Sequence, residues 1–87
     1  MKAVVTVIGK DKTGIIASVT GELHKLGANV EDISQTILQE YFVMTMLVSC
    51  RSVEFEKLSN ALSELAKKVG VDIKAMHEDL FNVMHRI

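Results

Sequence analysis

The chain begins its first structural unit with the segment Val4-Val5-Thr6-Val7-Ile8-Gly9-Lys10-Asp11-Lys12-Thr13-Gly14-Ile15-Ile16. A run of β-branched residues stops at Gly9, and a short polar loop then leads through Gly14 into an apolar pair that suits a helix. Because the first turn of a helix leaves backbone N–H groups without helical partners, such a loop can hold the carboxylate of a small molecule. The segment therefore predicts a strand, a binding loop and a helix in succession.

The spacing of apolar residues places the other elements. Apolar side chains recur at steps of three and four after Gly14 and again after Val53, which predicts two helices, each followed by a glycine suited to a left-handed terminal residue. Asp11 or Thr13 would cap the first helix. Two strand-like runs that meet near Gln39 predict an antiparallel hairpin. The expected elements are strands 2–8, 29–39, 41–50 and 71–75, helices from near 14 to 26 and 53–69, and a tail over 78–87 as a short helix or packed arm.

The resulting order, β-α-β-β-α-β, is a doubled βαβ unit, and a chain of 87 residues has room for one domain, 1–87. Its compact form is an α+β, ferredoxin-like sandwich, in which both helices cover one face of a four-stranded antiparallel sheet. Right-handed crossovers place the first and third strands in the centre of the sheet and the second and fourth at its edges.

The other face of such a sheet has no helix over it. In the first strand, Val4 and Ile8 would point to one side and Val5 and Val7 to the other, so both faces are apolar. An open face in a monomer is ordinarily polar at alternate positions. Either the tail from Leu80 to Ile87 or a second subunit is expected to cover this face, with pairing through an edge strand as a related alternative. We expect a homodimer.

Composition argues against several functions. Ten basic residues stand against 11 acidic ones, and this net charge of −1 argues against nucleic-acid binding. No apolar run approaches the roughly 20 residues that cross a bilayer, and the first strand follows the N-terminus too closely for a signal peptide. Cys50 is the single cysteine, which excludes a disulfide within the chain and a thiolate metal cluster. A reducing, cytoplasmic setting is expected.

The loop Gly9-Lys10-Asp11-Lys12-Thr13-Gly14 and the two isoleucines after it resemble the first loop of the ACT domain. The turn Leu26-Gly27-Ala28-Asn29-Val30 continues this resemblance, and the order and lengths of the elements agree over nearly the whole chain. The chain looks like the short stand-alone members of the family and is similar to one half of the glycine cleavage system transcriptional repressor. Because ACT domains are small regulatory modules that bind amino acids and related metabolites, the resemblance implies that function here.

The same loop supplies the candidate ligand-binding residues. Backbone N–H groups around Lys12 to Ile15 could receive a carboxylate, Asp11 could take an ammonium group, and Lys10 or Lys12 could add charge. Asn29 carries both donors and an acceptor. In ACT dimers the loop of one subunit typically faces the start of the second strand of its neighbour. The resemblance thus implies a site made by Asp11, Lys12, Thr13, Gly14 and Ile15 of one subunit with Asn29 and Val30 of the other.

Other interpretations remain open. A ligand-free protein interaction module fits the same fold. A small acylphosphatase-like enzyme would use the first loop as a phosphate cradle, but that chemistry needs an arginine near the helix start, and the two arginines are Arg51 and Arg86. His77, Asp79 and His85 could meet at a metal ion, although their spacing matches no regular ligand motif. We expect neither a metal nor a cofactor.

Overall fold

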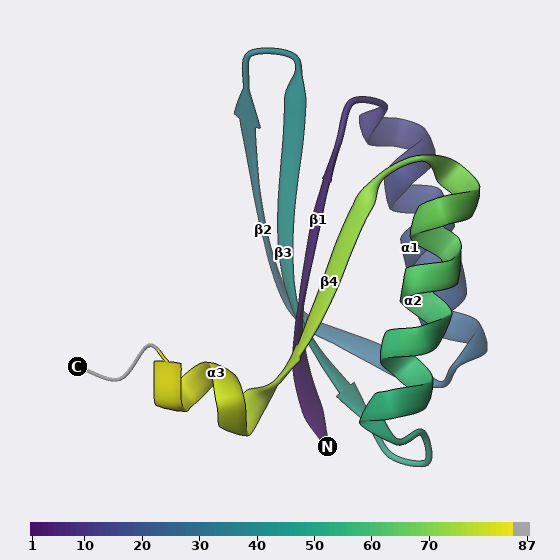
Figure 1. The fold of residues 1–87 in the computed structure, drawn as a ribbon, viewed down its shortest axis with the longest axis vertical. Coiled ribbons are helices and arrows are strands. Elements are labelled where there is room, and N and C mark those ends of the chain that lie inside the picture. The colour runs from purple at the N-terminus through teal and green to yellow at the C-terminus, as the bar shows by residue number, and fades with distance from the viewer. Residues whose placement is uncertain (85–87) are drawn as a thin grey trace.

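Seven elements make up the fold in the computed structural model, which describes residues 1–84 apart from the side chain of Lys12. In chain order they are β1 (Lys2–Gly9), α1 (Lys12–Lys25), β2 (Ala28–Leu38), β3 (Tyr41–Cys50), α2 (Phe55–Val69), β4 (Asp72–His77) and α3 (Glu78–Met84) (Figure 1). The expected strands and helices all form, and the tail begins as the short helix α3. Residues 85–87 of the expected tail lie outside the described residues.

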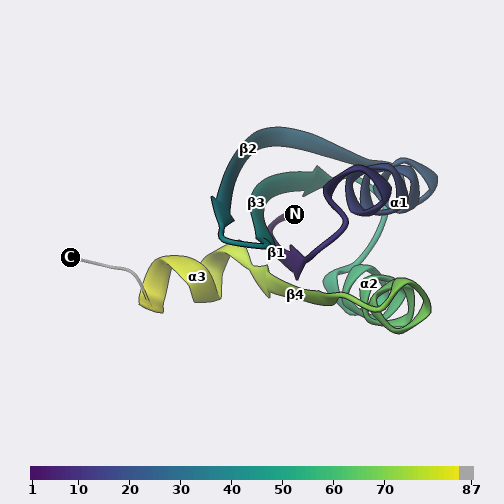
Figure 2. The same cartoon turned by 90° about the horizontal axis from the view of Figure 1, so that it is seen from above.

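The four strands form one sheet in the order β2-β3-β1-β4, and every neighbouring pair is antiparallel. The ferredoxin-like arrangement predicted from the sequence is therefore confirmed, with β1 and β3 in the centre. Helices α1 and α2 pack together on one face of the sheet, whereas α3 lies on the opposite side (Figure 2).

Alternation along the two central strands builds the core. Val5 and Val7 of β1 and Met44 and Met46 of β3 are fully buried on the side of α1 and α2. Cys50, at the end of β3, completes this row as a small apolar filler, and its burial raises the pKa of its thiol. The core is aliphatic apart from Phe42 and is formed by Ala3, Val5, Val7, Ile15, Val19, Leu23, Ala28, Phe42, Met44, Met46, Val48, Cys50, Leu58, Leu62 and Ile73.

Local hydrogen bonds and glycines set the ends of the helices. Asp11, and not Thr13, caps α1, because its carboxylate accepts a hydrogen bond from the Gly14 amide at 3.2 Å. The helix begins at residue 12, slightly before the start expected from the sequence. After the two long helices, Gly27 and Gly70 adopt positive φ angles of 73° and 72°, as expected for left-handed terminal residues. Each helix can therefore turn directly into the following strand.

Within residues 1–84, the sheet face opposite α1 and α2 is covered at one end. There α3 contacts β1 and β4, and Phe81 is half-buried. A hollow of about 330 Å³ remains between α3 and the β2–β3 hairpin. Leu80, Val83 and Met84 of α3 stay 52%, 70% and 60% exposed. The described part of the tail therefore leaves most of this face open.

β2 is an edge strand, and within residues 1–84 it pairs with β3 alone. All its residues from Asn29 to Leu38 are exposed. The register shifts between Val30 and Asp32, and the extra residue Glu31 places a carboxylate oxygen 3.1 Å from Nζ of Lys2 in β1. A hydrogen bond from Ser49 of β3, and next the Lys2 contact, lower the pKa of the Glu31 carboxyl. This bulge therefore links three adjacent strands on the open face.

Candidate functional site

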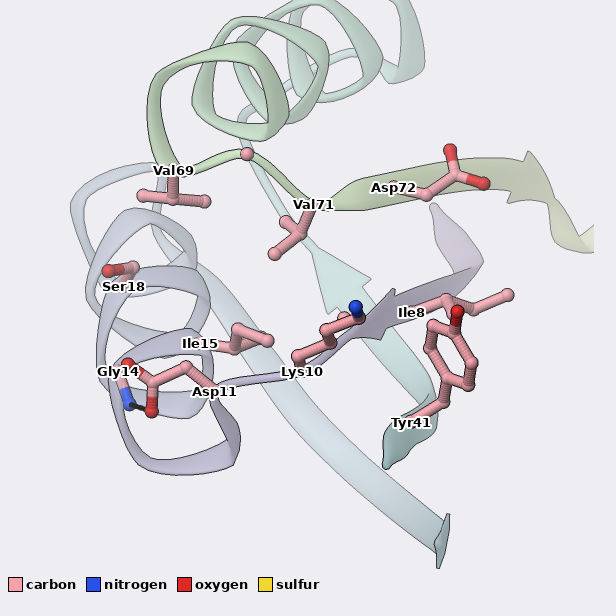
Figure 3. A pocket seen from close by; sticks show the side chains of 12 residues that line it. Ile8, Lys10, Asp11, Gly14, Ile15, Ser18, Tyr41, Val69, Val71 and Asp72 are labelled. Atoms are coloured by element: carbon pink, nitrogen blue, oxygen red, sulfur yellow. Dashed lines mark hydrogen bonds between the residues drawn. The ribbon is translucent and has the colours of Figure 1, made fainter. Parts of the chain in front are cut away.

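A cleft of about 660 Å³ lies where β1 leads into α1 and where α2 leads into β4 (Figure 3). Its volume is in the range of small-molecule sites in proteins. One wall comes from the end of β1 and the start of α1, and the other comes from the α2–β4 turn, residues 69–72. Tyr41 at the start of β3 lines its rim. A single chain therefore supplies both walls.

Gly9 permits the two walls to approach each other. An ideal Cβ built on Gly9 would overlap the Ile15 side chain and lie 2.7 Å from Cγ1 of Val71. Real Cβ atoms do not tolerate such contacts, so any larger residue would have to displace both neighbours. Ile15 and Val71 extend toward each other between the walls (Figure 3). The cleft thus has an apolar base that depends on the missing side chain of Gly9.

The amide groups of the β1–α1 loop are partly engaged within the chain. The Gly14 amide donates to the Asp11 carboxylate, and the Ile15 amide donates to the Asp11 carbonyl oxygen at 3.0 Å. Two of the amides expected around Lys12 to Ile15 therefore already have acceptors within the chain. Helix geometry leaves the amides of Lys12 and Thr13 as the ones without helical partners.

Charged groups surround the cleft unevenly. Lys10 lies on the rim, where its ammonium group is 3.1 Å from a carboxylate oxygen of Glu40 and 5.4 Å from the centre of the Tyr41 ring. This ion pair connects the β1–α1 loop with the turn between β2 and β3. Asp11 and Asp72 line the same cleft, and the Asp11 carboxylate is turned toward the Gly14 amide (Figure 3). Among the side chains that the structure describes, the lining therefore includes one basic residue and two acidic ones.

The predicted site residues fall into two groups. Asp11, Gly14 and Ile15 line the cleft, and the backbone of Lys12 and Thr13 lies between them in the first turn of α1. Asn29 and Val30, however, begin β2 at the other end of the sheet. Gly9 pairs with Phe42 of β3, whereas Asn29 pairs with Ser49, which is seven residues further along β3, or about 23 Å. The two groups cannot meet within one chain.

Sequence reasoning did not find the wall formed by residues 69–72. Gly70 is identified from the sequence only as a helix terminus, and Val69 and Val71 only as parts of apolar patterns. The pairing of Ile8 with Asp72 brings this turn to the cleft, because β4 runs antiparallel to β1. The strand order predicted from the sequence already places the fourth strand beside the first. It does not predict which residues of the two strands pair, and that pairing decides which turn reaches the cleft.

The residues of the enzyme and metal hypotheses lie elsewhere. Arg51 follows β3 at the end of the sheet opposite Gly9, and Arg86 and His85 lie outside the described residues. The His77 Nδ1 accepts a hydrogen bond from the Asp79 amide at 3.1 Å, and the His77 ring packs edge-on against Phe55. Within residues 1–84, no group of three or more His, Cys, Asp or Glu residues is arranged to hold a metal ion.

Comparison with known proteins identifies the class. The sandwich with its glycine-bounded first loop is the architecture of small regulatory domains, and the family model of the ACT domain matches residues 2–76. A UPF0237 protein of Clostridium acetobutylicum is 54% identical over 89 residues, which cover 100% of both chains. A UPF0237 protein of Methanopyrus kandleri is 46% identical over 88 residues, covering 99% of this chain and 98% of that one. The chain therefore belongs to the ACT domain family.

Solved structures agree with this assignment. An ACT domain protein from Streptococcus pneumoniae is 43% identical, covers 93% of each chain and superposes with a TM-score of 0.84. A candidate glycine cleavage system transcriptional repressor is 17% identical and has a TM-score of 0.74, covering 85% of this chain and 44% of that one. The second likeness concerns the fold alone, and it agrees with the expected similarity to one half of such a repressor. Among residues 1–84, no helix is long and apolar enough to cross a membrane.

Proposed function

We propose that this chain is a regulatory module that binds an amino acid or a related small carboxylate, and that it acts as a homodimer. The observation that carries this proposal is the cleft of about 660 Å³ beside the β1–α1 loop. Asp11, Gly14 and Ile15, which the sequence nominates as ligand-binding residues, line it. Membership of a family of regulatory domains supports the same function.

The loop offers a suitable group for each end of an amino acid. The amides of Lys12 and Thr13 would donate to the ligand carboxylate, and the positive end of the α1 dipole would favour that charge. Lys10 adds a cation on the rim. Asp11 keeps its Oδ1 atom on the Gly14 amide, and its Oδ2 atom would accept from the ammonium group of the ligand. The cap residue therefore positions the loop and contacts the ligand at once.

The homodimer would bring Asn29 and Val30 of a second copy to the end of the sheet where the β1–α1 loop lies. The outer edge of β2 is exposed and carries apolar side chains, with Ile33 42% and Ile37 62% exposed. Antiparallel pairing of two such edges about Ile33 would bring Asn29 of the second copy level with Ile37. Ile37 pairs with Phe42, which also pairs with Gly9, so Asn29 of the second copy would lie level with the β1–α1 loop along the strand direction, on the β2 side of the sheet. Edge pairing would also remove the exposed backbone groups of β2.

A ligand that touches both copies would regulate the assembly. It binds the paired arrangement more tightly than the separate chains, so it shifts the equilibrium toward the dimer by its difference in affinity. The same linkage predicts that the ligand raises the melting temperature. We place this activity in the cytoplasm, where the thiol of Cys50 would stay reduced. We assign no catalytic role, because Arg51 lies far from the loop.

A thermal-shift screen of the common amino acids and small carboxylates tests this function, together with sedimentation velocity with and without each hit. Asp11→Asn keeps an N-cap residue but removes the charge, so it should abolish the shift caused by a hit without unfolding α1. Asn29→Ala should weaken the shift, whereas Asp79→Asn on α3 serves as the matched control. A monomer that responds to no compound would contradict the proposal.

A ligand-free interaction module is the second candidate. The exposed apolar side chains on the β2 edge and on α3, such as Ile37 and Val83, favour it, because grouped apolar exposure marks contact surfaces. It predicts self-association that is indifferent to every compound in the screen. Ile33→Lys should then reduce self-association, while Asp11→Asn should change nothing.

A further inference from the structure

The α2–β4 turn forms a wall of the cleft that the proposed function does not use. Val69 is the last residue of α2 and is 36% exposed, and Val71 is half-buried beside Gly9. Together with Ile15 they give one side of the cleft an aliphatic surface. Ligand pockets combine such apolar walls with a few polar groups that fix orientation. This wall is therefore placed to contact the ligand's side chain.

The charges of the cleft favour a ligand that carries both signs. Among the described lining residues, Lys10 is basic, Asp11 on the β1–α1 wall is acidic, and Asp72 on the α2–β4 wall is acidic. A plain carboxylic acid would meet two like charges here, and a plain amine would meet Lys10. An α-amino acid brings one ammonium and one carboxylate group, so it complements the lining. Its side chain is then left to contact the aliphatic surface.

We propose that the α2–β4 turn, residues 69–72, determines the specificity of this site and selects an aliphatic α-amino acid. Val69 and Val71 contact the ligand side chain, and Asp72 assists Asp11 in attracting the ammonium group. This inference rests on the proposed function. It adds the class of ligand and assigns residues from the second half of the chain, which the loop resemblance does not reach.

Isothermal titration with L-leucine, L-alanine and 4-methylpentanoate, which is leucine without its amino group, tests the inference. The wild-type protein should bind L-leucine more tightly than either other compound. Val69→Ala removes two carbons from the wall and should weaken L-leucine binding about fivefold to tenfold, with little effect on L-alanine. The substitution should not unfold α2, because alanine favours helix more than valine does. Val83→Ala on α3 is the matched control and should change neither affinity.

A second pair of variants addresses the ammonium group. Asp72→Asn should weaken L-leucine binding several-fold but should not weaken 4-methylpentanoate binding, and Asp79→Asn on α3 should change neither. If L-leucine binds and both Val69→Ala and Asp72→Asn behave like their controls, the inference is overturned while the proposed function stands. The same holds if only polar amino acids bind. If no amino acid or small carboxylate binds at all, both are overturned.

Discussion

Replacing Gly9 by alanine should destabilise the protein, because the base of the cleft leaves no space for a methyl group. The new Cβ would overlap the Ile15 side chain and lie 2.7 Å from Cγ1 of Val71. Since Ile15 is only 3% exposed, the core must absorb its displacement. Overpacking of this kind lowers the free energy of unfolding by about 1–3 kcal/mol. Alanine also reduces the conformational freedom of the unfolded chain, which raises the free energy of unfolding by about 0.4–1 kcal/mol. We expect the free energy of unfolding to fall by about 0.5–2 kcal/mol.

Gly21→Ala is the matched control for this experiment. Gly21 lies on α1, and a Cβ added there would meet nothing within 4 Å. Alanine should therefore stabilise this helix by about 0.5–1 kcal/mol, so the two variants should lie on opposite sides of the wild type. Each kcal/mol moves the melting temperature of a domain of this size by about 4–8 °C, which calorimetry resolves. Equal melting temperatures of the two variants would refute the tight packing of Gly9.

Three further substitutions address the cap, the core and the bulge. Asp11→Ala should lower the free energy of unfolding by about 1 kcal/mol, because the Gly14 amide loses its acceptor, whereas Thr13→Ala should leave it within about 0.5 kcal/mol in urea titrations. Leu62 is 1% exposed, so Leu62→Ala should lower the free energy of unfolding by about 2–5 kcal/mol. Leu80 is 52% exposed, so Leu80→Ala should lower it by less than about 1 kcal/mol. Similar losses for the two variants would contradict the assigned core. The pKa of Glu31 is lowered in the folded state, so its carboxylate stabilises the protein above its ordinary pKa of 4.5, and this contribution is lost as the pH falls through the lower folded value. The stability difference between wild type and Glu31→Gln should therefore shrink from pH 6 toward acid in urea titrations, and a constant difference would contradict the Ser49 and Lys2 contacts.

The sequence predicts the faces of the sheet well, because burial on one side of a strand imposes a period of two. Val5 and Val7 are assigned to one face of the first strand for this reason, and both are fully buried. The start of α1 is less well determined, since Asp11 and Thr13 are both suitable caps and only the folded loop decides between them. Asp11 is the cap, so it occupies one of the amides that a ligand was expected to take.

The second wall of the cleft could not be predicted from local pattern. Its position depends on which residue of β4 pairs with Ile8, and alternation alone allows shifts of two residues without exchanging the faces. In the structure the partner is Asp72, and the preceding turn therefore meets Gly9. The position of Asn29, in contrast, does not depend on the register. The predicted hairpin places Asn29 at the end of the sheet away from the β1–α1 loop in every register.

The construction of the cleft from one chain has a consequence for titrations. Both walls come from the same copy, so a lone copy would already hold its ligand, at a stoichiometry of one per chain. Asn29 of a neighbouring copy would then add a contact after the ligand has bound, and this contact would slow dissociation of the ligand. At saturating ligand, dilution into single copies would shorten the residence time of the ligand without changing the number of ligand molecules bound per chain.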